Sequence, residues 1–288
     1  MVNKRNPSRT PAARERRRPA PKGAATRSAR PAPAGPRLPN GVEPVYGVHS
    51  VEALLARPSA SETVRTLWVQ QGDAERRLHE LMAQAQSVGI PVEFMVREQL
   101  DAAASGGNHQ GIMALCPPIE PASEQTLWWR LDDWKAEQAP LFLVLDGVTD
   151  PHNLGACLRN ADAAGAHGII VPKDRSATLN ATVRKVASGA AEAVPVYQVT
   201  NLARTLTTLQ EKGVWVLGMA GEAESMLYDI DLTGPCALVM GAEGKGMRRL
   251  TRERCDQWAK LPMAGEVSSL NVSVAAGITL FEAVRQRR

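Results

Sequence analysis

The feature that most constrains this fold is an alternation of short apolar segments with helical segments, which begins at Pro140 and continues to the end of the chain. Short apolar runs bounded by turn residues are typical of strands that are buried on both faces. Because helical patterns separate most of the runs, the sequence predicts a mostly parallel sheet covered by helices, that is, an α/β fold. The predicted strands are 141–145, 168–171, 194–199, 214–218, 237–240 and 258–261.

A smaller α/β pattern occupies residues 43–118 and is long enough to be an independent domain. The helix that we expect to be capped by Asp73 carries Leu78, Leu81, Met82 and Ala85 on one face. The remaining predicted elements are a helix over 49–57, strands over 63–70, 92–96 and 111–116, and a helix near 97–105.

Residues 119–139 are predicted to be a linker that contains a helix. Trp128, Trp129 and Trp134 lie in it, and exposed tryptophans can stack on RNA bases. Tryptophans at this spacing more often dock a helix onto a neighbouring surface, and we favour that interpretation.

The first 40 residues differ from the rest in charge and composition. They carry eleven Lys or Arg, one acid and eight Pro, a net charge of +10, which leaves about −6 for the rest because the whole chain carries +4. Such a segment is predicted to be disordered. We favour an arm that contacts RNA phosphates over a solubilising extension. A transit peptide is a third interpretation, which the many prolines oppose.

Several protein classes are disfavoured by what the chain lacks. No apolar run approaches the roughly 18–20 residues of a membrane span, and no signal-peptide pattern opens the chain. Four cysteines without a CxxC pair indicate reduced thiols in a cytoplasmic protein rather than a disulfide framework or a zinc site. Asp146, Asp150 and His152 suggest a metal site, but acids at strand ends more often cap loops, so no metal is expected.

Residues 143–166 form the first of three segments in which a strand leads into a polar loop. The carboxyl ends of parallel strands are where open α/β sheets bind ligands. Asn153 fits the N-cap of the following helix, and Gly155 permits close approach of a ligand or another backbone. Arg159 lies further along the helix, where it either holds an RNA phosphate or pairs with a nearby acid.

Residues 237–247 form the second segment, a hydrophobic strand followed by Gly241, Gly244 and Gly246. The spacing matches neither a P-loop nor a dinucleotide fingerprint. Glycines here allow the backbone to approach a flat ligand such as adenine. Glu243 lies at the tip, where the alternative interpretation is a tight turn with a solvated acid.

Residues 260–288 form the third segment, a short strand, a Ser-rich loop and a long final helix. Ser269 or Asn271 fits the N-cap of this helix, and the arginines of 285–288 suit its C-terminal dipole. Taken alone, the segment indicates only a capped helix. Its predicted apolar face is Val272, Ala275, Ala276, Thr279, Leu280 and Ala283.

Together, the three segments resemble the three signature motifs of the SpoU (TrmH) branch of the SPOUT methyltransferases, over residues 140–288. Residues 43–118 resemble the L30e-like RNA-binding domain of one subgroup. That subgroup methylates a guanosine ribose in the peptidyl-transferase region of large-subunit (23S) ribosomal RNA. The basic tail lies outside the usual pattern of the family.

The resemblance implies an α/β domain whose C-terminal part forms a deep trefoil knot, S-adenosyl-L-methionine as cofactor, and a homodimer with its active site between the two knots. The cofactor contacts carried over by position are Gly241, Leu261 and Leu270, with Met219, Ala220, Gly221 and Met263 lining the same pocket. The reaction would be attack of a ribose 2'-hydroxyl on the sulfonium methyl.

The family gives a central role to the first-motif arginine, here Arg159. Arg is effectively always protonated, so anchoring a phosphate or stabilising an alkoxide is easier to accept than acting as a base. Supporting polar positions are Asn153, Glu243, Ser269 and Asn271. The alternatives are a tRNA ribose methyltransferase, which the N-terminal domain opposes, and a noncatalytic RNA-binding ribosome-assembly factor, which the intact polar positions oppose. A nucleotide-dependent oxidoreductase is less favoured, because the chain lacks GxGxxG.

Overall fold

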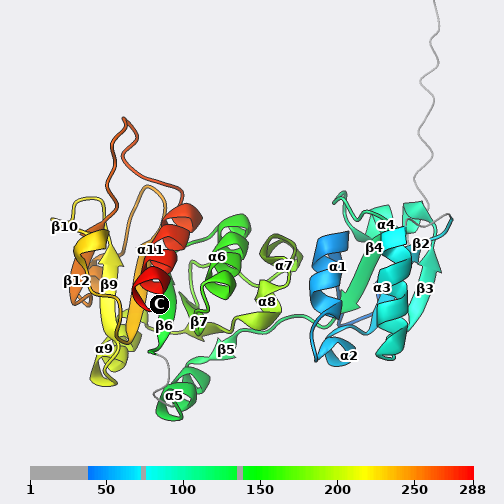
Figure 1. Ribbon diagram of the computed structural model, residues 1–288, viewed down its shortest axis with the longest axis horizontal. Helices are drawn as coiled ribbons and strands as arrows, with labels where there is room; N and C mark the ends of the chain where they lie inside the picture. Colours follow the sequence, from blue (N-terminus) through cyan, green and yellow to red (C-terminus); the bar gives the residue numbers. More distant parts are fainter. Residues whose placement is uncertain (1–37, 73–75, 135–138) are drawn as a thin grey trace, which may run out of the picture. The chain divides into compact units, whose positions relative to one another are not determined.

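The computed structural model describes residues 38–72, 76–134 and 139–288. Figure 1 shows these residues as two α/β regions, each built on its own sheet. Most of the tail 1–40, for which we predict disorder, lies outside the described residues, as does Asp73 with its predicted cap.

The N-terminal sheet has four strands in the order β1-β4-β2-β3. β4 pairs antiparallel with β1 and β2, whereas β2 and β3 are parallel. The elements are β1 (Glu43–Tyr46), α1 (Val48–Leu55), α2 (Ala60–Thr63), β2 (Thr66–Gln70), α3 (Arg76–Ser87), β3 (Val92–Met95), α4 (Arg97–Ala103) and β4 (Ile112–Cys116).

Two details of this region differ from prediction. Strand β1 was not predicted, because four residues next to glycine and proline carry little periodic signal. The predicted strand 63–70 starts late, because residues 60–63 form α2 and β2 begins at Thr66. The apolar face of α3 is confirmed: Leu78, Leu81 and Ala85 are buried, and Met82 packs against the same core.

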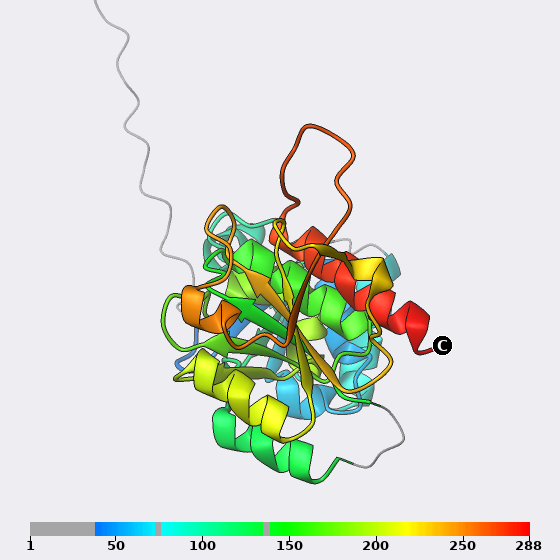
Figure 2. The ribbon, with the colours of Figure 1, turned by 90° about the vertical axis from the view of Figure 1, so that its left-hand side faces the viewer.

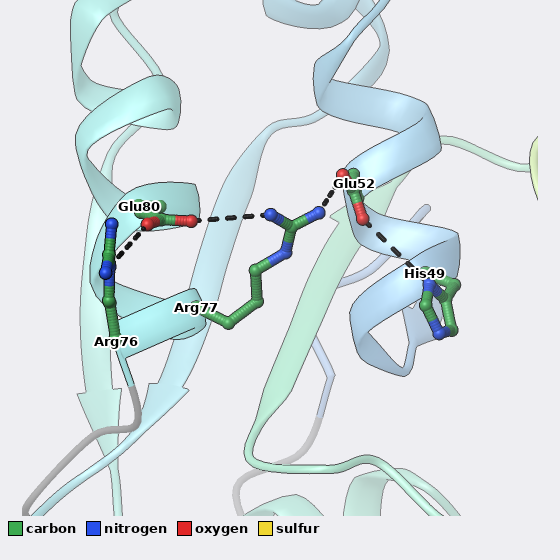
Figure 3. Close-up of polar contacts among 5 residues, drawn as sticks. All are labelled: His49, Glu52, Arg76, Arg77 and Glu80. Atoms are coloured by element: carbon green, nitrogen blue, oxygen red, sulfur yellow. Dashed lines mark hydrogen bonds and ion pairs between the residues drawn. The ribbon is translucent and has the colours of Figure 1, made fainter.

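A chain of charged side chains joins α1 to α3 on the surface (Figure 3). Arg77 pairs with Glu52 of α1 and with Glu80 of its own helix, and Arg76 and His49 extend the chain at its two ends. Pairs this exposed contribute little to stability.

The predicted linker helix is present as α5 (Glu124–Asp132), and Ser123 caps it by accepting from the amide of Thr126. Docking is confirmed for Trp128, which packs against the core, and for Trp134, whose ring meets the ring of His167 edge-on. The docking prediction is wrong for Trp129, whose side chain lies on the outer face of the helix and is 64% exposed.

The C-terminal sheet has eight strands in the order β10-β12-β9-β11-β6-β7-β8-β5, and every pairing in it is parallel. The six predicted strands are confirmed, with ends that shift by one or two residues. The strands are β5 (Ala122–Ser123), β6 (Leu141–Asp146), β7 (Gly168–Pro172), β8 (Val196–Val199), β9 (Trp215–Met219), β10 (Ser225–Met226), β11 (Cys236–Gly241) and β12 (Gln257–Lys260).

Helices cover both faces of this sheet, as Figure 2 shows in cross-section. In β6, Leu143 faces the core shared with α6 and α11, whereas Phe142 and Val144 face the core shared with α5 and α9. Burial on both faces explains the continuous apolar run in the sequence. The helices are α6 (Pro151–Ala163), α7 (Ala181–Ala187), α8 (Ala190–Ala193), α9 (Leu202–Glu211), the 3-10 turn η1 (Leu227–Asp229), α10 (Arg249–Arg252) and α11 (Val272–Gln286).

The last part of the chain runs from β12 back over one face of the sheet. β12 pairs with β9, and the chain then returns through a projecting loop to α11, which packs on α6. The predicted apolar face of α11 lies against this core. The trefoil knot stays a prediction.

A buried ion pair connects α7 and α8. Arg184 is 1% exposed, and its guanidinium lies 3.0 Å from a carboxylate oxygen of Glu192. We expect Arg184→Met to lower the free energy of unfolding by about 3–5 kcal/mol, because it leaves a carboxylate buried without its partner. Urea denaturation measures this change. Adding Glu192→Leu should recover only part of the loss, because Arg184 also donates to the carbonyl of Pro117 at 2.8 Å. A cost below about 1 kcal/mol for the single variant would contradict this prediction.

The four cysteines are free thiols, and three of them are buried. Burial raises the pKa of Cys157 to about 12, so this thiol is protonated at neutral pH. Within the described residues, no helix has the length and hydropathy of a membrane span.

Candidate functional site

The three polar segments lie at one edge of the C-terminal sheet. Asp146 at the end of β6 is opposite Gly241 at the end of β11, and Met240 is opposite Met219 at the end of β9. Because the strands are parallel, the loops that follow them emerge on the same side. Ala259 of β12 is opposite Met219 as well, so the third segment starts at the same edge. The pairings therefore bring together residues 146–150, 219–222, 241–248 and the chain that follows Lys260.

The helix of the first segment begins earlier than predicted. Asp150, not Asn153, is the N-cap of α6: its carboxylate accepts from the amide of His152, and Pro151 occupies the first turn. The sequence carried this signal, since an acid followed by proline is a typical helix start. Asn153 therefore lies inside the first turn, where its side chain is available for other contacts.

The close approach predicted at Gly155 is confirmed. A Cβ at this position would lie 2.7 Å from Cβ of Val186 and 2.9 Å from the carbonyl oxygen of Val183. Here the approaching group is α7 rather than a ligand, so the glycine allows α6 and α7 to pack.

Glu243 joins all three segments. Its Oε1 accepts from Nδ2 of Asn153 at 3.2 Å and from Nδ2 of Asn271 at 2.8 Å. Asn271 also donates to Oδ1 of Asn153 at 2.9 Å and caps α11 by accepting from the amide of Ser273. Glu243 is exposed on a turn, as the alternative interpretation predicted, but its carboxylate also joins distant segments. The N-cap prediction is confirmed for Asn271 and not for Ser269.

The loop after β11 is a tight hairpin. Ala242 and Gly246 exchange backbone hydrogen bonds of 3.1 and 2.8 Å, while Gly244 and Gly246 adopt positive φ. A Cβ on Gly241 would lie 2.2 Å from both the carbonyl carbon of Gly246 and the amide nitrogen of Met247. The strand end and the returning loop therefore touch backbone to backbone, which only glycine permits.

A buried carboxylate holds the far end of this hairpin. The side chain of Asp146 is fully buried, and it accepts from the backbone amide of Arg248 at 2.8 Å and from its Nε at 2.5 Å. The sequence indicated that acids such as Asp146 cap loops, but not that the loop would come from a segment 102 residues away.

We expect Asp146→Ala to weaken binding of S-adenosylhomocysteine about 10- to 100-fold, because a charge-assisted hydrogen bond contributes roughly 1.5–3 kcal/mol and its loss frees the hairpin. Calorimetry measures the affinity. Asp146→Asn keeps an acceptor oxygen, so its affinity for S-adenosylhomocysteine should fall by less than that of the alanine variant. Wild-type affinity in the alanine variant would show that the hairpin holds its shape without this carboxylate.

The first of two cavities at this edge measures about 390 Å³. It lies between the hairpin, the end of β9 and the loop that precedes α11. Its lining includes the seven residues that the family resemblance singled out, namely Met219, Ala220, Gly221, Gly241, Leu261, Met263 and Leu270. Ser269 and Glu243 line it as well. The structure thus brings these residues together, and their role as cofactor contacts stays a prediction.

The second cavity measures about 520 Å³ and lies on the other side of the hairpin. The loop between β6 and α6 forms one wall, and Arg175 contributes from the loop after β7. Glu243 and Val272 line both cavities, so the two share a wall. The sequence analysis did not predict this cavity or Arg175.

Arg159 lies apart from both cavities. It is exposed on α6 and has no hydrogen-bond or ion-pair partner in the part of the chain that the structure describes. The predicted alternative of pairing with a nearby acid is therefore not seen. Its neighbour Asn160 donates to the carbonyl of Ser273 at 2.7 Å, which fixes α6 against α11. Residues 38–72, 76–134 and 139–288 contain no cluster of three potential metal ligands.

Two family models match the chain. Residues 140–281 match the SpoU rRNA Methylase family, and residues 44–122 match the model for RNA 2'-O ribose methyltransferase substrate binding.

Similar proteins from several bacteria carry the name 23S rRNA (guanosine-2'-O-)-methyltransferase RlmB. The one from Pseudomonas aeruginosa is 59% identical over 245 residues, which is 85% of this chain and 97% of the relative. The one from Escherichia coli is 55% identical over 245 residues, 85% of this chain and 99% of the relative.

Solved structures agree in fold. The SpoU methyltransferase AviRb from Streptomyces viridochromogenes, in complex with the cofactor AdoMet, superposes with a TM-score of 0.69 at 26% identity, covering 86% of this chain and 91% of that one. An RNA 2'-O ribose methyltransferase superposes with a TM-score of 0.71 at 24% identity, over 86% and 89% of the two chains, and shows the fold alone.

Proposed function

Because this chain belongs to the SpoU family of RNA methyltransferases, we propose that it transfers a methyl group from S-adenosyl-L-methionine to the 2'-hydroxyl of a guanosine in large-subunit (23S) ribosomal RNA. The observation that carries the proposal is the first cavity, in which the second and third segments meet beside Glu243. The substrate follows from the relatives, which match this chain over nearly their whole length.

The first cavity suits the cofactor in size and chemistry. Its volume of about 390 Å³ lies within the range of small-molecule sites, and much of its lining is apolar, including Met240 and Leu270. Gly221 and Gly241 keep part of the wall free of side chains, as a flat adenine requires. Charged side chains of both signs line the cavity, which suits a ligand that carries a sulfonium, an ammonium and a carboxylate group; they are Glu222, Glu243, Lys245, Arg252 and Lys260.

When bound, S-adenosyl-L-methionine supplies an activated methyl group, so the protein must supply position and electrostatics. Glu243 lines both cavities and holds the side chains of Asn153 and Asn271 in place. Ser269 lines the cofactor cavity nearby. We propose that these four residues orient the ribose, and that Arg159 stabilises negative charge on the attacking oxygen or anchors an RNA phosphate.

We also propose that the active unit is a homodimer. Arg159 lies outside both cavities of its own chain, so a role at the reacting atoms requires that it serve the cavity of a second copy. Val274 and Phe281 on α11 are 50% and 46% exposed, and they provide apolar surface for such a contact. Free thiols and a ribosomal substrate support a cytoplasmic location.

A methyl-transfer assay tests the function. Purified protein and labelled S-adenosyl-L-methionine are offered unmodified large-subunit rRNA and, separately, tRNA, and the modified nucleotide is mapped. A 2'-O-methylguanosine in the rRNA alone is the expected result. Label in tRNA alone would keep the chemistry and overturn the substrate. No label in either RNA, with S-adenosylhomocysteine bound, would favour a noncatalytic factor.

A further inference from the structure

The second cavity is distinct from the one that we assign to the cofactor, and the two share part of their lining, namely Ala242, Glu243, Lys245, Gly246 and Val272. A 2'-hydroxyl can attack the methyl group only if its nucleotide lies next to the cofactor. At about 520 Å³, the second cavity is large enough for a nucleotide, and its position is the one that the reaction requires.

Three of the six charged side chains that line this cavity have side-chain partners. Asp146 and Arg248 pair with each other, and Glu243 accepts from two asparagines. Three remain, namely Asp150, Arg175 and Lys245. Asp150 uses one carboxylate oxygen for the amide of His152, and a carboxylate has further lone pairs to offer.

The backbone at Arg175 is also unusual. Its φ of 58° lies in the left-handed region, which non-glycine residues seldom adopt. Such conformations cost free energy and concentrate at functional sites. Arg175 is exposed and has no hydrogen-bond or ion-pair partner among the residues that the structure describes, as is also true of Lys245.

The cavity therefore offers one carboxylate and two free cations. Guanine is the RNA base whose Watson–Crick edge presents two adjacent donors, N1–H and the N2 amino group, and a carboxylate accepts from both. Adenine and cytosine each present an acceptor beside a single donor. The two cations suit the phosphates on either side of the nucleotide.

We propose that the second cavity binds the target guanosine, with the carboxylate of Asp150 reading the N1–H and N2 amino donors of the base and with Arg175 and Lys245 contacting its phosphates. The inference rests on the proposed function and adds to it the residue that selects guanine. The names of the relatives give the nucleoside but not the group that recognises it.

Inosine tests this proposal, because it keeps N1–H and lacks only the N2 amino group. The mapped target guanosine is replaced by inosine in an rRNA fragment, and kcat/KM for methyl transfer is compared between wild type and Asp150→Asn. Asn caps helices as well as Asp does, so α6 should keep its start. Asp174→Asn, in an exposed acid outside both cavities, is the matched control.

In the wild type and the control, inosine is expected to lower kcat/KM about 10- to 100-fold, the value of a hydrogen bond to a charged group. In Asp150→Asn, kcat/KM for the guanosine RNA should fall by a similar factor. Replacing guanosine with inosine should then lower kcat/KM only a few-fold further. The affinity of this variant for S-adenosylhomocysteine should stay unchanged. An equal inosine penalty in Asp150→Asn, or no penalty in wild type, would overturn the proposal.

A binding measurement separates this inference from the proposed function. Calorimetry with guanosine and inosine 3',5'-bisphosphates, in the presence of S-adenosylhomocysteine, needs no methyl transfer. If wild type methylates no guanosine RNA, the proposed function fails. The base assignment would still stand if guanosine bisphosphate bound more tightly than its inosine analogue and Asp150→Asn removed the difference. Equal binding of the two would overturn it.

Discussion

Replacing Gly241 with alanine is expected to abolish cofactor binding. The new Cβ would lie 2.2 Å from two backbone atoms of the returning hairpin, closer than real Cβ atoms come to any neighbour. The hairpin cannot yield easily, because Ala242 and Gly246 bond to each other and Arg248 is held by Asp146. One wall of the cofactor cavity must therefore move.

We expect Gly241→Ala to weaken S-adenosylhomocysteine binding at least about 100-fold, which corresponds to about 3 kcal/mol. Calorimetry on the folded variant measures this loss, and circular dichroism checks the fold. Gly234→Ala is the matched control, because nothing lies within 4 Å of its Cβ position and its φ is not positive. An affinity close to wild type in Gly241→Ala would show that the hairpin does not form the cofactor wall.

Replacing Arg159 with alanine is expected to remove methyl transfer and leave cofactor binding intact. Its guanidinium lines neither cavity of its own chain, so affinity for S-adenosylhomocysteine should not change. Turnover should fall at least about 100- to 1,000-fold, the range for losing a group that stabilises developing charge. Arg159→Lys keeps the positive charge but loses the planar fork of guanidinium donors. Arg249→Ala, on α10 and outside both cavities, is the control.

Mixing the two variants tests where Arg159 acts. In a dimer of one Arg159→Ala chain and one Gly241→Ala chain, one site would combine an intact cofactor cavity with the arginine of the other chain. Co-expressed, reassorted dimers should then regain about a quarter of wild-type activity, because half of them are mixed and each has one working site. No recovery in dimers shown to be mixed, or near wild-type turnover in Arg159→Ala alone, would refute this role.

The sequence predicted most of the C-terminal sheet because burial on both faces leaves a continuous apolar run in each long strand. It did not predict the two-residue strands β5 and β10, or β1 in the N-terminal sheet. Segments that short have no periodicity to detect, and their pairing depends on a neighbouring strand that is already in place.

For the site, the sequence by itself determined the chemistry that was available: glycines where the backbone must approach closely, and Asn153, Glu243 and Asn271 as polar groups at strand and helix ends. Only the tertiary structure decided how they act. The bonds that join them span 28 to 118 residues of chain, so they depend on which strands are neighbours in the sheet. The tertiary structure also places Arg159 outside both cavities and Asp150 in the lining of the second. Contacts between distant segments follow from packing and not from local sequence, so the sequence alone could not predict these positions.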